Sequence, residues 1–408
     1  MLRKDMTRFE PFLGLRYDDE LARLAEVIAP PYDIVDAKEH AQLSERSPFN
    51  AIHVELPEPE GERDRYGHAA QLFAEWQQLG VLRRDDVDAL YLYRMSFVDE
   101  SDQMRSTTGV IGALGIDASS AGTVLPHERT MPKPKGDRLD LLRATKINVS
   151  PIWGLSLAEG LADVLIGVTT SQPALQRATD DEGTTHELWM VTDQSIITQI
   201  CELIGLTPVV VADGHHRYET SGYYRSEIRA QNGDLPGDHD LVMALIVELS
   251  PDELFVQAIH RLIKGLAEDF DIVAGLSRHF VITRGPGDIS DLSRSLVPHG
   301  ALGLITPDGN YLLVPTAELN GAAEADLDSS RLDLALEGFP AHELRYQHGS
   351  HVCAGLVADG FAQCAVLLRP ATVAQIAETA RSGNRMPPKT TFFNPKPRTG
   401  MVYRPLVD

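Results

Sequence analysis

Apolar and polar positions recur with two different periods along the chain, and these periods predict its helices and strands. Between residues 66 and 80 the apolar residues lie three or four positions apart and end at a glycine, which predicts an amphipathic helix. Runs with a period of two, and short apolar runs bounded by turn residues, predict strands. The predicted strands cover residues 25–35, 50–57, 89–97, 107–116, 207–212 and 364–370.

The order of these elements predicts a mixed fold. The strands at 89–97 and 107–116 are joined by a short polar stretch, which favours an antiparallel pair. Strands and helices otherwise alternate, including a helix that starts near Asp137 with that residue as its cap. The acidic, alanine-rich stretch 316–333 is expected to be a loop or a connection between subdomains. The fold class is therefore α/β, of the mixed α+β type.

The length of the chain favours at least two domains. A single core rarely grows past ~250 to 300 residues, and the chain has 408. We expect a core with N-terminal strands and a charged loop over residues 1–265. A C-terminal α/β subdomain is expected over residues 266–408, with a tail that is free to return to the core.

Charge and cysteine content exclude several classes of function. The net charge is −22, from 59 acidic and 37 basic residues, which would repel a nucleic acid. The longest apolar runs are too short to span a bilayer, and no signal peptide is apparent, so we expect a soluble, cytoplasmic protein without a membrane partner. Three cysteines without a C-x-x-C pair indicate neither a disulfide framework nor a thiolate zinc site.

The stretch VVVADGHHRYETSGYYR carries the strongest chemical signal. A buried strand ends at Asp213-Gly214, and a helix begins with His215, His216 and Arg217. Backbone N–H groups and the helix dipole attract an anion at such a turn, glycine allows close approach, and arginine forms a planar fork for phosphate oxygens. The plainer alternative is that Asp213 caps the helix, Arg217 pairs with a nearby acid and the histidines are ordinary residues.

A second cluster lies in the proline-rich and charged stretch 124–155. A basic patch inside an acidic protein indicates a small anionic ligand, and a glutamate among cations is suited to bind Mg²⁺ or to act as a base. The alternative is a solvated charged loop. The residues of this cluster are His127, Glu128, Arg129, Thr130, Lys133, Lys135, Asp137, Arg138 and Arg143.

Common nucleotide-binding and hydrolase motifs do not occur in the sequence. No Walker A sequence, dinucleotide fingerprint or G-x-S-x-G elbow is present. Near the C-terminus, RMPPKTTFFNPK is suited either to supply a further cation to a site, such as Lys389, or to pack as a final strap. Any phosphate donor would therefore be held by other means.

Five stretches together resemble the bacterial family labelled domain of unknown function 1015, over nearly the whole chain. These stretches are VIAPPYDIV, SPFNAIHVELP, LPHERTMPKPKGDRLDLLRATKINVSPIW, VVVADGHHRYET and RMPPKTTFFNPK. The family label implies no activity.

The stretch ADGHHRY also resembles the phosphate-binding turn of the ParB and sulfiredoxin-like superfamily, over about ten residues. That likeness implies a ParB/sulfiredoxin-like core. Because His215 stands where sulfiredoxins have their cysteine, and because the chain is acidic, sulfur chemistry and DNA binding are disfavoured. Among the activities of this superfamily, the resemblance therefore favours that of the kinases that act on free L-serine.

This resemblance and the two clusters suggest a small-molecule kinase with L-serine as favoured acceptor. The donor is ATP, ADP or pyrophosphate, with Mg²⁺ expected as cofactor and no metal ligands assigned. The alternatives are a nucleotide or phosphate hydrolase and a non-catalytic nucleotide-sensing protein, and a homo-oligomer remains open. Catalytic roles fall to Glu128, His127, Asp213 and Arg138, and phosphate binding to Gly214, His215, His216, Arg217, Lys135 and Arg143.

Overall fold

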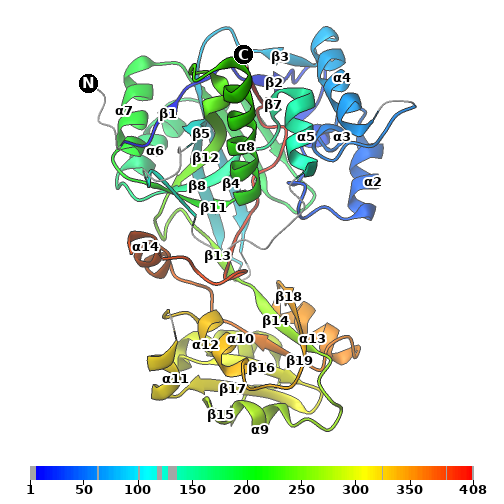
Figure 1. Cartoon of the computed structure of the whole chain (residues 1–408), viewed down its shortest axis with the longest axis vertical. Helices are drawn as coiled ribbons and strands as arrows, with labels where there is room; N and C mark the ends of the chain where they lie inside the picture. The colour runs from blue at the N-terminus through cyan, green and yellow to red at the C-terminus, as the bar shows by residue number, and fades with distance from the viewer. Residues whose placement is uncertain are drawn as a thin grey trace. The chain divides into compact units, whose positions relative to one another are not determined.

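The structure of the chain is a computed structural model. It describes residues 6–61, 64–99, 102–116, 122–126, 136–323, 325–382 and 384–406. Of these, residues up to Pro126, residues 136 to Phe255 and residues from Pro395 onward form one compact unit, called unit 1. Residues Val256–Asn394 belong to a second, unit 2 (Figure 1). Unit 1 is therefore built from segments that are distant in the sequence.

A nine-stranded mixed sheet forms the centre of unit 1. Its strand order is β6-β11-β8-β12-β5-β4-β10-β9, with β1 paired to β5. The pairs β6–β11 and β8–β12 are parallel, and the other pairs are antiparallel. The strands are β1 (Phe9–Glu10), β4 (Leu90–Val98), β5 (Met104–Gly115), β6 (Val124–Pro126), β8 (Ile152–Ser156), β9 (Gln176–Thr179), β10 (Thr185–Val191), β11 (Val209–Asp213) and β12 (Leu241–Glu248).

Two small sheets and eight helices complete the described part of unit 1. The small sheets pair β2 (Leu15–Tyr17) with β3 (Leu82–Arg84), and β7 (Ile147–Asn148) with β21 (Arg404–Pro405). The helices are α1 (Leu24–Val27), α2 (Ala37–Arg46), α3 (Ile52–Glu55), α4 (Arg65–Gln78), α5 (Gly136–Thr145), α6 (Leu161–Ser171), α7 (Gln194–Gly205) and α8 (His215–Asn232), with a 3₁₀ turn at Asp238–Asp240.

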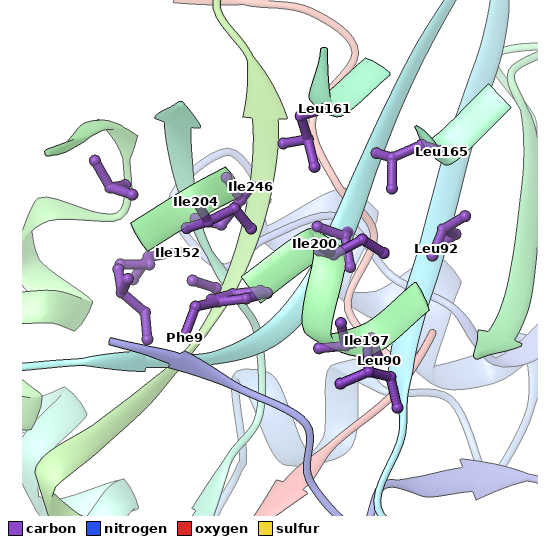
Figure 2. Packing of buried hydrophobic residues seen from close by; sticks show 14 of the residues in the cluster. Phe9, Leu90, Leu92, Ile152, Leu161, Leu165, Ile197, Ile200, Ile204 and Ile246 are labelled. Carbon is purple, nitrogen blue, oxygen red and sulfur yellow. The ribbon is translucent and has the colours of Figure 1, made fainter. Parts of the chain in front are cut away.

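The main core of unit 1 lies between the sheet and the helices α6 and α7. Leu161 and Leu165 of α6 and Ile197, Ile200 and Ile204 of α7 are buried against apolar residues of the strands, as Figure 2 shows. This burial follows from their spacing, because residues three or four positions apart lie on one face of a helix. Removing this apolar surface from water stabilises the packing of both helices on the sheet.

Unit 2 contains a six-stranded antiparallel sheet, in the order β15-β17-β16-β19-β14-β18. Two apolar clusters cover it, one with α11 and α12 and one with α10 and α13. A separate pair joins β13 (Val256–Ala258) and β20 (Thr391–Phe393). The other elements are β14 (His260–Lys264), β15 (Phe280–Arg284), β16 (Leu302–Thr306), β17 (Gly309–Pro315), β18 (Glu343–Gln347), β19 (Cys364–Leu367), α9 (Ile272–Leu276), α10 (Ile289–His299), α11 (Ala317–Ala322), α12 (Asp328–Leu336), α13 (Ser350–Ala358) and α14 (Val373–Arg381).

Several predictions of local structure are confirmed, and the α/β fold class is among them. The helix expected at 66–80 is α4, and the strands expected at 89–97 and 107–116 are β4 and β5, which pair antiparallel. The strand expected at 207–212 is β11. The longest regular patterns thus gave the correct elements.

Two strands predicted near the N-terminus are wrong. Within 25–35, residues up to Val27 belong to the short helix α1, and only an isolated bridge between Ala29 and Thr399 has strand geometry. Within 50–57, Ile52–Glu55 form α3, which begins where the Asn50 side chain accepts a hydrogen bond from the Ile52 N–H at 2.9 Å. A buried single-turn helix and a half-buried strand give similar patterns over so few residues.

The loop predicted at 316–333 is also wrong. Thr316 caps α11 by accepting a hydrogen bond from the Leu319 N–H at 3.2 Å, and α12 begins at Asp328. Alanine and glutamate favour helices, so charge alone did not indicate irregular structure. The helix predicted near Asp137 is α5, but Asp137 lies inside its first turn and is not its cap. Among the described helices, none is both long and apolar enough to cross a bilayer.

Candidate functional site

The junction between β11 and α8 has the geometry of an anion-binding turn. Gly214 connects the strand to the helix with a φ of +83°, a conformation that glycine adopts without strain. A Cβ at this position would lie 3.0 Å from Arg217 Nε. Within the described residues no side chain caps α8, and the N-terminus of a helix attracts negative charge. The turn can therefore accept a phosphate group.

Asp213 holds two cations at this turn. Its Oδ2 atom accepts a hydrogen bond from Arg217 Nη2 at 2.8 Å, and its Oδ1 atom accepts one from Lys396 Nζ. Burial raises the pKa of Asp213, but the charges of Lys396 and Arg217 outweigh burial and hold that pKa well below its ordinary value. Asp213 is therefore suited to position these cations and poorly suited to accept a proton.

Arg217 connects the turn to a small cavity. Its Nη1 atom donates to the Pro151 carbonyl, while its Nε atom is buried without a hydrogen-bond partner among the described residues. Its side chain lines a cavity of about 50 Å³. Burial lowers the pKa of Arg217, but the negative charges of nearby acids outweigh it and raise that pKa. These acids are Asp213, Asp33 and Glu55.

Glu55 is a buried carboxylate on the wall of the same cavity. Its side chain is 1% exposed. Its Oε1 atom accepts hydrogen bonds from Ser150 Oγ at 3.0 Å and from the Tyr32 N–H at 3.4 Å. Its Oε2 atom is buried and, within the described part of the chain, has no partner. An unsatisfied buried carboxylate oxygen costs stability, so it is expected to have a function.

Arg138 supplies a second cation to this cavity. Its Nη1 atom donates to the Glu55 carbonyl at 2.6 Å and lies 3.9 Å from Glu55 Oε1. Its guanidinium lies 4.4 Å from the centroid of the Tyr32 ring, and Asp137 accepts a hydrogen bond from its Nε at 2.8 Å. Arg138, Arg217 and Glu55, from three distant stretches of sequence, therefore line one cavity.

The remaining predicted site residues have mixed outcomes. His215 and His216 lie in the first turn of α8, where His216 Nδ1 is 4.0 Å from Glu219 Oε2. Arg143 lies apart from the cavity, because its guanidinium pairs with Asp140 and Glu227. Six residues of the second predicted cluster lie outside the described residues, namely His127, Glu128, Arg129, Thr130, Lys133 and Lys135.

Sequence reasoning missed three residues of this region. Glu55 was hidden by the wrong strand prediction, since alternation places it on the polar face. Tyr32 follows two consecutive prolines and lies inside the stretch 25–35, which was wrongly predicted to be a strand. Lys396 ends the C-terminal stretch that was considered as a source of a cation, although Lys389 was the residue named. The position of Lys396 between two prolines was the one feature of the sequence that could have indicated it.

The described residues contain no group of three or more His, Cys, Asp or Glu side chains placed to hold a metal ion. Mg²⁺ commonly binds through one or two carboxylates together with substrate phosphates and water. Asp33, whose negative charge acts on Arg217, is a carboxylate suited to that role. The residues present thus fit an ion that arrives with a phosphorylated ligand.

One family model matches most of the chain. The model described as protein of unknown function (DUF1015) covers residues 9–335. None of the curated proteins matches the sequence.

Solved structures with a distant likeness include a free serine kinase variant in complex with AMP, at 15% identity and a TM-score of 0.35. The matched region covers 66% of this chain and 84% of the kinase chain. SbnI with C-terminal truncation from Staphylococcus aureus is 12% identical, with a TM-score of 0.37, over 72% of this chain and 86% of that chain. A conserved hypothetical protein from Pyrococcus furiosus is 14% identical, with a TM-score of 0.34, over 69% of this chain and 90% of that chain. At these values the likenesses carry no argument about activity.

Proposed function

Because this chain belongs to the DUF1015 family of proteins of unknown function, its activity has to be inferred from its site, and we propose that it is a phosphotransferase. The reaction moves a phosphoryl group from a nucleotide or pyrophosphate to a small hydroxylated metabolite. L-Serine is the favoured acceptor, on the resemblance of residues 212–218 to the turn of free-serine kinases.

The observation that carries this proposal is the meeting of Arg138, Arg217 and the buried Glu55 on one cavity. In phosphoryl transfer the protein mainly positions the reactants and neutralises charge, and two arginines beside a helix N-terminus suit both tasks. The Oε2 atom of Glu55, buried and without a partner among the residues that the structure describes, suits proton transfer.

The proposed roles follow from these positions. The backbone N–H groups after Gly214, together with Arg217 and the histidines at 215 and 216, bind the donor phosphates. Arg138 neutralises charge on the transferred group. Mg²⁺, when bound with the donor, would neutralise its phosphate oxygens, and Asp33 is suited to help hold it.

Proton transfer is assigned to Glu55. Its Oε2 atom takes the proton of the acceptor hydroxyl as the acceptor oxygen bonds to phosphorus. The bond from phosphorus to the leaving oxygen of the donor breaks, and the electron pair stays with the shortened donor. Asp213, which binds Lys396 and Arg217, has a positioning role instead. The role expected for Glu128 stays a prediction.

Phosphorus NMR tests this proposal directly. The full chain is incubated with Mg²⁺ and ATP, ADP or pyrophosphate in turn, with and without L-serine. We expect a new phosphomonoester signal that needs both serine and protein. The signal should be lost in Arg217→Ala and kept in Arg294→Ala, a matched surface variant whose arginine pairs only with Asp291 among the described residues.

The other outcomes identify the alternatives. Equal consumption of the donor without serine would contradict the serine kinase proposal and favour a hydrolase or another acceptor. Stoichiometric donor binding without any product would instead favour a nucleotide-sensing protein.

A further inference from the structure

Unit 2 contains a cavity of its own, with a volume of about 180 Å³. None of the described residues that line it lines the cavity of unit 1 described above. Its wall includes Ile259, just after β13, and Thr390, just before β20. The first turn of α12 contributes Asp328 and Ser329, and Thr372 is the capping residue of α14. The cavity is thus formed by segments of unit 2 that are far apart in the sequence.

Two arginines make this cavity chemically distinctive. Arg261 is 1% exposed, and its Nη1 atom donates to the Ile259 carbonyl at 2.7 Å while its guanidinium stacks 4.6 Å from the Tyr346 ring centroid. Arg369 binds Asp328 through Nε at 2.9 Å and Nη2 at 2.5 Å. Its Nη1 atom has no hydrogen-bond partner among the described residues. A planar guanidinium of this kind binds carboxylates well.

The acidic residues of the wall limit the charge of a ligand. Asp328 is buried, and its carboxylate is shared by Arg369 and by Arg331, whose Nη1 lies 3.5 Å from it. Asp326 is largely exposed and pairs with Arg331. These two carboxylates would repel a doubly charged anion such as phosphate, whereas a single negative charge is compatible with the paired arginines.

We propose that this cavity binds a small organic monocarboxylate, with its carboxylate at Arg261 and Arg369 and its aliphatic part against Ile259 and Leu368. Hydroxyl groups of Ser329, Thr372 and Thr390 complete the polar side of the wall. The volume is close to that of the cavity of about 150 Å³ that holds benzene in an engineered protein, so the ligand is of similar size. This site is independent of the proposed phosphotransferase activity.

Titration calorimetry of the full chain tests the proposal with three probes. These are 3-methylbutanoate, its neutral analogue 3-methylbutanamide, and inorganic phosphate, each at up to about 10 mM. We expect saturable binding of the carboxylate and at least about tenfold weaker binding of the amide and of phosphate. Equal binding of the amide, stronger binding of phosphate, or no binding of the carboxylate would overturn the proposal.

Two variants locate the site. Arg369→Gln removes the charged fork, and Val297→Trp places a large ring at the rim, at a position that is 67% exposed and therefore tolerant of substitution. Both should weaken carboxylate binding by about tenfold or more, while Arg294→Gln, on the same helix as Val297, should leave it unchanged. Unchanged binding in both Arg369→Gln and Val297→Trp would place the ligand elsewhere and overturn the assignment.

Discussion

Asp213 illustrates how the chemistry of one residue depends on a partner that is distant in the sequence. From the local stretch alone it is a candidate base or a helix cap. In the structure it accepts hydrogen bonds from Arg217 and from Lys396, which lies 183 positions further along the chain. A carboxylate with both oxygens bound by cations stabilises positive charge at the turn, which suits phosphate binding.

The Asp213–Lys396 pair should make stability depend on pH. The folded pKa of Asp213 is lowered, so its contribution is complete above its unfolded pKa of about 4 and is lost as pH falls through the lowered folded value. Lys396→Met should lower the free energy of unfolding at neutral pH by about 3 kcal/mol, the lower end of the cost of removing one partner of a buried ion pair. The difference in the free energy of unfolding between this variant and the wild type should become smaller as the pH is lowered below about 4.

Urea unfolding of both proteins over this pH range measures the effect. Lys38→Met, at an exposed position of α2, serves as the control and should change stability little. A difference between Lys396→Met and the wild type that stays constant with pH would contradict the role given to the pair.

At the scale of elements, the hydrophobic pattern correctly predicted several long helices and strands, but it predicted the wrong structure for some short ones. The strands β4, β5 and β11 and the helix α4 were predictable because their periods extend over several residues. The four-residue helix α3 was not, since its buried residues imitate a strand. That local error hid Glu55 from the candidate site. In the sequence, Arg138 and Arg217 lie in two separate clusters, and only the packing of α5 and α8 around one cavity brings the two residues together.

The junction of β11 and α8 is an element-level test. Gly214→Ala places a Cβ in a backbone conformation that L-residues avoid, and 3.0 Å from Arg217 Nε. We expect a loss of about 1 to 2 kcal/mol in the free energy of unfolding, together with weaker donor binding. Gly167→Ala in α6, where an added Cβ has open space, should not be destabilising. Unfolding curves and calorimetry with ADP provide the measurements, and equal behaviour of the two variants would contradict the account.

At the scale of the whole molecule, the contributions of the last residues of the chain depend on packing that no pattern shows. Met401, Val402 and Tyr403 are buried within unit 1, and Arg404 pairs with Asp238. Residues 256–394 have their own apolar clusters, and their ends are adjacent because Val256 is paired with Phe393 across β13 and β20.

This arrangement predicts that unit 2 folds alone and that unit 1 requires the tail. A protein of residues 256–394 should give dispersed NMR spectra and a cooperative thermal transition. A chain that ends at Asn394 should lose the cooperative unfolding of unit 1, because buried apolar side chains are removed. An unfolded 256–394 fragment, or an unaffected unit 1 in the shortened chain, would contradict the prediction.

Glu55 is proposed to accept the proton of an acceptor hydroxyl beside Arg138 and Arg217. The most direct test is the initial rate of phosphoserine formation in Glu55→Gln, with donor affinity measured on the same sample. We expect a rate about 100-fold or more below wild type with nearly unchanged donor affinity. Glu253→Gln, at a buried glutamate that accepts a hydrogen bond from the Thr108 N–H, should stay close to wild type. A folded Glu55→Gln protein that works at the wild-type rate would contradict the claim.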